Sequence, residues 1–253
     1  MHIRTAFRRV ARLAPGNSLR CLLYRLGGVR IGAKVSIARG VPVGSAVSIA
    51  CNATIESGAT IGSNTVIGEA AEIRQGARVG PRVEIGAGVL VSSNSLLQNC
   101  TIGAHSFVEY GVILTGSGDN RVTVGKHCYL GIYGVLDGSG GITIGDFVQI
   151  ATVQIWTHTS VYQCLAGEEL AQSSPRRKTA PVRIESNVWI GAYTVIYPGV
   201  TIGHHAVILP NSAIAQDVSS YCMVGGVPAR LRRRIVIDDG EPRFVSAESR
   251  DQV

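Results

Sequence analysis

One histidine of this sequence stands where a polar segment interrupts a regular pattern. His158 opens the longest irregular segment, residues 157–183, which contains two glutamates and the basic run Arg176-Arg177-Lys178. A neutral imidazole within hydrogen-bonding reach of a hydroxyl can take its proton as the oxygen attacks an acyl carbon. His158 is therefore a candidate general base, and an ordinary loop histidine is the alternative. No group that would orient the imidazole can be identified from the sequence.

The other candidate metal and redox ligands form no recognised pattern. Four histidines fall at outward positions of the repeat described below: His105, His127, His204 and His205. The six cysteines are Cys21, Cys51, Cys100, Cys128, Cys164 and Cys222. None belongs to a CxxC pair, and their spacing matches neither a zinc site nor a disulfide framework. We therefore expect no bound metal and a reducing, cytoplasmic compartment.

Basic residues gather near both ends of the chain, which has a formal net charge of +7 and a pI of about 9.3. Residues 1–30 hold seven arginines and no acidic residue, and a second cluster comprises Arg230, Arg232, Arg233 and Arg234. Such clusters attract phosphate groups, anionic lipid or nucleic acid. The apolar run Leu22-Leu23-Tyr24 is too short for a signal peptide or a membrane-spanning helix, so neither is expected.

A period of six residues organises most of the chain. Large aliphatic residues recur at every sixth position from Ile31 to Leu97, usually followed by Gly or Ala. The pattern slips by one residue at Ile102 and then returns in shorter series, with 27 interior positions in all, of which Trp156 alone is not aliphatic. Neither a helix nor a single strand has this period. It predicts a short strand plus a turn, with one inward side chain per unit.

The repeat resembles that of the hexapeptide-repeat family over residues 31 to about 230. The resemblance implies an all-β fold, a left-handed parallel β-helix in which three hexapeptides make one coil. The 27 units would give nine coils and a prism about 43 Å long. We expect a basic helical cap over residues 1–28, the β-helix over 29–230 with its loop at 157–183, and a C-terminal tail over 231–253.

The cap has an apolar side as well as its arginines. Leu19, Leu22, Leu23 and Leu26 share one face of a predicted helix. The simpler interpretation is a cap that closes the open end of the prism. The alternative adds peripheral contact with an anionic membrane surface.

A long ordered string is similar to the sugar O-acetyltransferases of this superfamily. It begins at Thr157-His158, resumes at 180–191 (APVRIESNVWIG) and 196–203 (IYPGVTIG), and ends at 226–230 (GVPAR). The resemblance implies an acetyl-CoA-dependent acyltransferase with His158 as catalytic base. It also implies coenzyme A contacts from Trp189, Ala192, Pro210, Ala215, Arg230 and Arg233. Gln216 stands where many relatives carry a lysine.

The acceptor side departs from the family pattern. Asp137 is present as a candidate substrate residue, but Leu130-Gly131-Ile132 lacks the asparagine that would hold a simple sugar. We therefore expect an acceptor in capsule, exopolysaccharide or O-antigen biosynthesis, and no nucleic acid. The family further implies a homotrimer. N-acetylation of an amino sugar nucleotide, an acyl-carrier-protein donor, a zinc carbonic anhydrase and a non-catalytic β-helix scaffold are the alternatives; the HxxxxH spacing of the zinc enzymes is absent.

Overall fold

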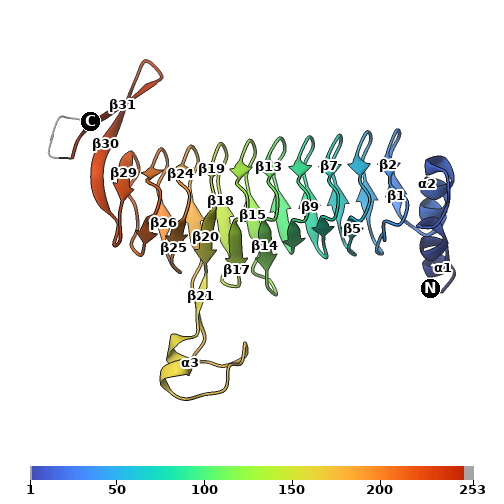
Figure 1. Cartoon of the computed structure of the whole chain (residues 1–253), viewed down its shortest axis with the longest axis horizontal. Coiled ribbons are helices and arrows are strands. Elements are labelled where there is room, and N and C mark those ends of the chain that lie inside the picture. The colour runs from blue at the N-terminus through green and yellow to red at the C-terminus, as the bar shows by residue number, and fades with distance from the viewer. Residues whose placement is uncertain (1, 248–253) are drawn as a thin grey trace.

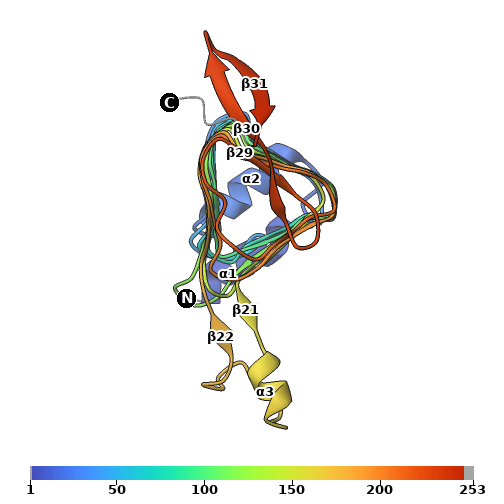
Figure 2. The same ribbon diagram turned by 90° about the vertical axis from the view of Figure 1, so that its left-hand side faces the viewer.

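The computed structural model describes residues 2–247 as one elongated prism with a triangular cross-section (Figures 1 and 2). Three parallel sheets form its sides, two helices cover one end, and a hairpin extends from the other (Figure 1). Successive strands pass from one sheet to the next, so each coil of chain contributes one strand to every side. This is the β-helix that the resemblance implies, built from the short strands and turns that the period of six predicts.

The strands are mostly two to four residues long. The first sheet comprises β1 (Arg30–Ile31), β3 (Ser48–Ile49), β6 (Val66–Ile67), β9 (Val83–Ile85), β12 (Cys100–Ile102), β15 (Val122–Val124), β18 (Ile142–Ile144), β23 (Val182–Ile184) and β26 (Thr201–Ile202). The second comprises β2 (Ser36–Ile37), β4 (Thr54–Ile55), β7 (Glu72–Ile73), β10 (Leu90–Val91), β13 (Phe107–Val108), β16 (Tyr129–Leu130), β19 (Gln149–Ile150), β24 (Trp189–Ile190), β27 (Val207–Ile208), β29 (Cys222–Gly225), β30 (Arg230–Asp238) and β31 (Glu241–Ser246). The third comprises β5 (Thr60–Ile61), β8 (Arg78–Val79), β11 (Leu96–Gln98), β14 (Ile113–Gly116), β17 (Val135–Gly138), β20 (Val153–Trp156), β25 (Thr194–Ile196) and β28 (Ala213–Ile214).

The predicted interior positions form the core, with two exceptions. Ile31, in the first coil, is half-buried. Trp156 is also half-buried, and its predicted interior place is taken by Ile155, which is fully buried. The interval from Ile150 to Ile155 is five residues, because the turn after β19 is one residue shorter. Strand alternation then turns Trp156 outward.

Close stacking of the coils explains the small residue that follows most interior aliphatics. A side-chain carbon on Gly103 would lie 2.4 Å from the Gly125 carbonyl oxygen of the next coil. Backbone contact at this distance leaves no room for any side chain. The glycines of the repeat are therefore a steric requirement of the fold.

The helices α1 (His2–Ala11) and α2 (Asn17–Leu26) lie across the N-terminal end of the prism (Figure 1). The sealing face differs from the predicted leucine face. Arg20, Cys21 and Tyr24 are the buried residues of α2, whereas Leu19 and Leu22 are exposed. Within residues 2–247, no helix combines the length and hydropathy that a bilayer span needs.

The C-terminal residues do not form an open tail over the part that the structure describes. β30 pairs antiparallel with β29, and β31 folds back on β30 to form a hairpin (Figure 1). The last six residues of the predicted tail, 248–253, lie outside the described residues.

The predicted loop 157–183 is an arm that leaves the prism at one edge (Figure 2). Its base is a two-stranded antiparallel ribbon of β21 (His158–Thr159) and β22 (Lys178–Thr179), and its tip contains α3 (Val161–Leu165). His158 is paired with Thr179 in this ribbon. The histidine therefore lies where the arm joins the coils.

Candidate active site

One edge of the third sheet carries a row of outward side chains. The register of β14, β17 and β20 places Thr115, Asp137 and Trp156 next to one another. The same alignment continues through Ile155, Ile196 and Ile214, so the residues that follow the last two, Tyr197 and Ala215, extend the row. This row runs along the prism axis toward the C-terminal end.

His158 and Asp137 meet at this edge. Nδ1 of His158 lies 3.3 Å from Oδ1 of Asp137, and the side chains are 24% and 23% exposed. Nδ1 is buried and makes no well-aligned hydrogen bond, so a small rotation of the ring toward the carboxylate would complete one. Catalytic hydrogen bonds are commonly long before substrate binds. The indole of Trp156 meets the imidazole edge-on, with ring centroids 5.9 Å apart.

Thr157 joins the arm to the coil. Its buried hydroxyl donates to the Asp137 carbonyl oxygen at 2.6 Å and accepts from the Gly140 amide at 2.7 Å. Its own carbonyl oxygen accepts from the Ala180 amide at 3.0 Å, where the chain returns from the arm. Thr157 thus fixes the backbone on both sides of His158 relative to Asp137. Sequence analysis missed this role, because a threonine beside a histidine carries no distinctive signal.

The arrangement favours one tautomer of His158. A proton on Nδ1 would point at the carboxylate of Asp137, which leaves Nε2 as the basic nitrogen. Oδ1 of Asp137 also accepts from the Ser139 amide at 3.0 Å, which helps to hold the carboxylate in place. The pair can therefore accept a proton at Nε2 and stabilise the resulting imidazolium. Asp137 is therefore the candidate for the orienting group that the sequence did not reveal.

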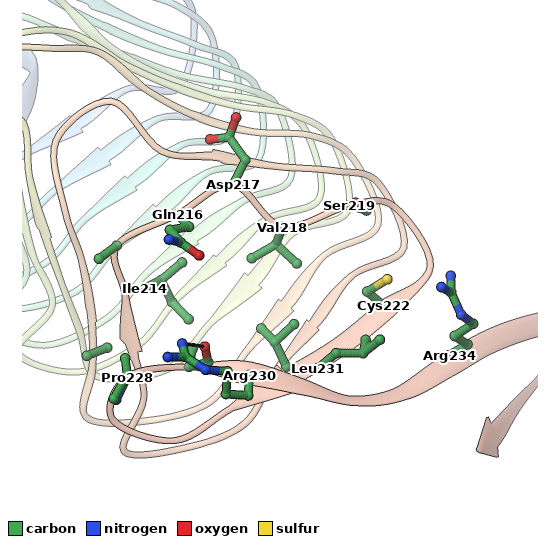
Figure 3. A pocket seen from close by; sticks show the side chains of 14 residues that line it. Ile214, Gln216, Asp217, Val218, Ser219, Cys222, Pro228, Arg230, Leu231 and Arg234 are labelled. Carbon is green, nitrogen blue, oxygen red and sulfur yellow. Dashed lines mark hydrogen bonds between the residues drawn. The ribbon is translucent and has the colours of Figure 1, made fainter. Parts of the chain in front are cut away.

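The C-terminal end holds a pocket of about 520 Å³ between the last coil and β30 (Figure 3). Ala215 and Arg230 line it together, as do Gln216 and Arg234 (Figure 3). Its basic residues are exposed, and within residues 2–247 Arg230 makes no ion pair. Arg234 was not among the predicted donor residues, although it belongs to the same basic cluster in the sequence.

The remaining predicted donor residues lie elsewhere on the prism. Trp189 projects from the second sheet and is 41% exposed. Ala192 and Pro210 lie in successive coils at the edge between the second and third sheets, where the Asn211 amide donates to the Ala192 carbonyl. Arg233 is paired with Met223 and does not line the pocket. The structure thus brings together Ala215 and Arg230, and not all six predicted residues.

The other histidines lie on a different edge. His105 stacks on His127, which stacks on Phe147, with centroids 5.3 and 4.9 Å apart. His205 stacks on Tyr221. The pKa of His205 is lowered mainly by burial and secondarily by the neighbouring His204. Within residues 2–247, no three His, Cys, Asp or Glu side chains are grouped as metal ligands would be.

Comparisons with known proteins agree with the repeat and the fold. A family model described as bacterial transferase hexapeptide (six repeats) matches residues 181–216, and one described as hexapeptide repeat of succinyl-transferase matches residues 58–93. LpxA from Acinetobacter baumannii superposes with a TM-score of 0.53 at 18% identity, over 81% of this chain and 72% of that chain. The predicted left-handed parallel β-helix is therefore confirmed.

Two curated relatives that are acetyltransferases by name match parts of the chain. The galactoside O-acetyltransferase of Escherichia coli (strain K12) is 31% identical over 138 residues, which are 53% of this chain and 64% of that protein. A chloramphenicol acetyltransferase of Escherichia coli is 49% identical over 51 residues, which are 20% of this chain and 24% of that protein. The chain thus spans less than two thirds of the length of either relative. Repeat, fold and matches together support a hexapeptide-repeat acetyltransferase.

Proposed function

We propose that this protein transfers an acetyl group from acetyl-CoA to a hydroxyl of a sugar in a bacterial surface glycan or its precursor. The observation that carries the proposal is the contact between Nδ1 of His158 and Oδ1 of Asp137 at the base of the arm. This contact directs Nε2 of the imidazole away from the carboxylate and leaves it available to a substrate hydroxyl.

The chemistry is a direct transfer. Nε2 of His158 takes the proton of the acceptor hydroxyl as its oxygen attacks the thioester carbonyl carbon. The carbon–sulfur bond then breaks, and the imidazolium returns the proton to the thiolate, which leaves as coenzyme A. Asp137 stabilises the imidazolium between these two steps. The products are an O-acetyl sugar and a free thiol, and no covalent intermediate on the protein is required.

The row along the third sheet supports a donor path. From Trp156 it passes the half-exposed Tyr197 to Ala215, two strand spacings or about 10 Å away. At Ala215 it reaches the pocket lined by Arg230 and Arg234. Guanidinium groups suit phosphates, so this end would hold the phosphates of coenzyme A while the thioester lies near His158.

Positive charge beside the histidine supports an anionic acceptor. Nη2 of Arg177 donates to Oγ of Ser139 at 3.1 Å, two residues from Asp137. Arg176 pairs with Glu168, whereas Arg177 has no carboxylate partner within residues 2–247. A guanidinium in this place suits an acidic sugar or the diphosphate of a sugar nucleotide. We assign Asp137 to positioning His158, in place of its predicted role in holding the acceptor.

Exposed apolar side chains support assembly as a trimer with the site between neighbouring prisms. Leu165 and Leu170 on the arm are 80% and 82% exposed. On the second sheet, the register aligns Phe107, Tyr129 and Trp189 in one outward row, interrupted only by Gln149. Exposed apolar patches of this kind mark interfaces. A neighbouring copy would cover them and complete the walls around His158.

Thiol release tests the proposal directly. The full chain is incubated with acetyl-CoA and a panel of sugar nucleotides and bacterial oligosaccharides, with detection of free thiol and of the acetylated sugar by mass spectrometry. We expect acceptor-dependent release that His158→Ala abolishes and His127→Ala leaves intact. A protein that does not bind acetyl-CoA in calorimetry would be a non-catalytic scaffold. An amide product would indicate N-acetylation.

A further inference from the structure

The N-terminal end of the prism exposes an apolar face that the fold itself does not use. On α1 and the turn after it, Ile3, Val10 and Leu13 are 74%, 57% and 59% exposed. On α2, Leu19, Leu22 and Leu26 are each about half exposed. Spacings of three, four and seven residues place Ile3 with Val10 on one side of α1 and the three leucines on one side of α2, and Leu13 follows in the turn after α1. Leucines that sealed the coils would be buried, so this face has another use.

Different residues seal the end of the prism. Tyr24 is fully buried, and its hydroxyl donates to the Val41 carbonyl oxygen. Nε of Arg20 donates to the Ile37 carbonyl oxygen at 2.7 Å, which satisfies an acceptor of the first coil. Ala11 packs into the same core. The capping function is thus complete without the exposed leucines and isoleucine.

The charge at this end has one sign. Residues 1–55 contain eight arginines and one lysine, and the first carboxylate side chain of the sequence is Glu56. Three of the arginines bond backbone carbonyls: Arg8, Arg20 and Arg25. Four more are exposed and make no ion pair within residues 2–247: Arg4, Arg9, Arg12 and Arg30. Uncompensated positive charge attracts an anionic surface.

A shallow recess lies beside α1. Arg8, Arg9 and Arg12 line it from the helix, and Ser45 and Ser63 line it from the first coils. The two serine hydroxyls are 3.1 Å apart. Guanidinium and hydroxyl donors converge here in the combination that suits a phosphate oxygen. The recess could hold the headgroup of an anionic phospholipid whose acyl chains lie against the apolar face.

We propose that this end of the prism docks on an anionic membrane surface, with the apolar faces of α1 and α2 in the interface and the unpaired arginines on lipid phosphates. Together, α1 and α2 carry basic side chains and a separate apolar face. Helices that lie in the membrane interface have this composition. The prism axis then rises from the membrane. The coil that contains β18 and Asp137 lies six strand spacings, about 29 Å, from β1.

Vesicle cosedimentation of the full chain tests this proposal. The vesicles are phosphatidylcholine alone or phosphatidylcholine with phosphatidylglycerol, each at low and high salt. We expect binding only to the anionic vesicles, and weaker binding at high salt because the attraction is screened. Inorganic phosphate at the lipid phosphate concentration should not release the protein, since the apolar contact also holds it.

Two variants distinguish this surface from the general basicity of the chain. Arg9→Gln with Arg12→Gln should weaken binding about 30-fold, at about 1 kcal/mol for each arginine near the lipid surface. The matched control, Arg78→Gln with Arg183→Gln, removes two exposed arginines from the coils and should retain most of the binding. Leu22→Gln with Leu26→Gln should also weaken binding, whereas Val66→Gln on an exposed strand position should not.

Thermal melting checks that each variant is folded. Equal losses in the arginine pair and its control would overturn the proposal in favour of non-specific attraction. Full-length protein that ignores anionic vesicles at low salt would overturn it outright. Neither result depends on the transferase activity, because the readout is sedimentation alone.

Discussion

The coils before residue 98 and those after residue 130 share a core but differ on the outside. Ile73 of the second sheet and Leu136 of the third both point into the interior and are buried. Around Ile73 the chain keeps its period of six, and outward charges pair with one another, as Arg74 does with Glu56 of the preceding coil and with Glu72, two residues before it. Around Leu136 the period is interrupted twice, and the interruptions carry Asp137 and His158.

This difference separates the residues that make the fold from those that can do chemistry. Interior side chains are fixed by the period, since each must fill the space between three strands. Residues inserted at an edge of the prism do not have to fill the interior, so they can be polar. The neighbouring coils hold them in place. Substitution of an outward side chain should therefore affect activity only in an interrupted coil. Substitution of a core side chain should lower stability similarly in both kinds of coil.

The largest expected effect is on catalysis by the interrupted coil. His158→Ala should lower the rate of acetyl transfer by about 10²–10⁴, the usual contribution of a general base. The melting temperature should stay close to that of the wild type, because the side chain is partly exposed. His127→Ala is the matched control, since His127 is an exposed edge histidine stacked between His105 and Phe147. Activity within a few fold of wild type in His158→Ala would refute the assignment.

The next effect concerns the core that both regions share. Ile73→Ala and Leu136→Ala should each lower the free energy of unfolding by about 2–5 kcal/mol, because both leave a cavity in a close-packed interior. Chemical denaturation measures both. Similar losses would support one continuous core. A loss below about 1 kcal/mol in either variant would mean that the coil around that position can collapse, or unfolds separately.

The fold could be predicted from the sequence because its physical cause is local. One inward aliphatic per six residues, followed by a small residue, specifies strand, turn and stacking in every unit. The failures occurred where that pattern was extended too far. The period predicts Trp156 in the interior, but the turn before it is one residue shorter. Helical spacing predicts one face for the four leucines of α2, but Tyr24 occupies the sealing face and of the four only Leu23 packs against the core. Helical spacing identifies a face but not which face is buried.

The site was less predictable because it is assembled across coils. His158 and Asp137 are 21 residues apart, and only the register of β17 with β20 brings their positions together. Ala215 and Arg230 share a pocket, whereas Arg233 does not line it. The register of β29 with β30 shifts between Arg233 and Leu231, so neighbouring arginines of β30 have different surroundings, which a run of like residues in the sequence does not reveal.

Asp137→Asn should give a smaller loss than removal of the base. A hydrogen bond to a charged partner contributes about 1.5–3 kcal/mol, so kcat should fall about 10–10²-fold. The KM for acetyl-CoA and the melting temperature should not change, because an asparagine keeps an oxygen that can accept from the Ser139 amide. Asp146→Asn is the control, since the Asp146 carboxylate likewise accepts a backbone amide but lies on another edge. An equal fall in both variants would indicate a structural role.

The smallest effect is expected at the donor pocket. It tests whether the functional site extends from the interrupted coil to β30 of the C-terminal hairpin. Arg230 is exposed and lines the pocket, so its contact with a coenzyme A phosphate is screened by water and contributes about 1 kcal/mol. Arg230→Ala should therefore raise the KM for acetyl-CoA about fivefold and leave kcat unchanged. Arg233→Ala removes the same charge from the same strand but outside the pocket, and it should leave the KM near the wild-type value. Steady-state kinetics with acetyl-CoA, repeated with acetyl-dephospho-CoA, measures both. Equal increases in the two variants would mean that long-range charge attracts the donor and that no particular arginine holds it.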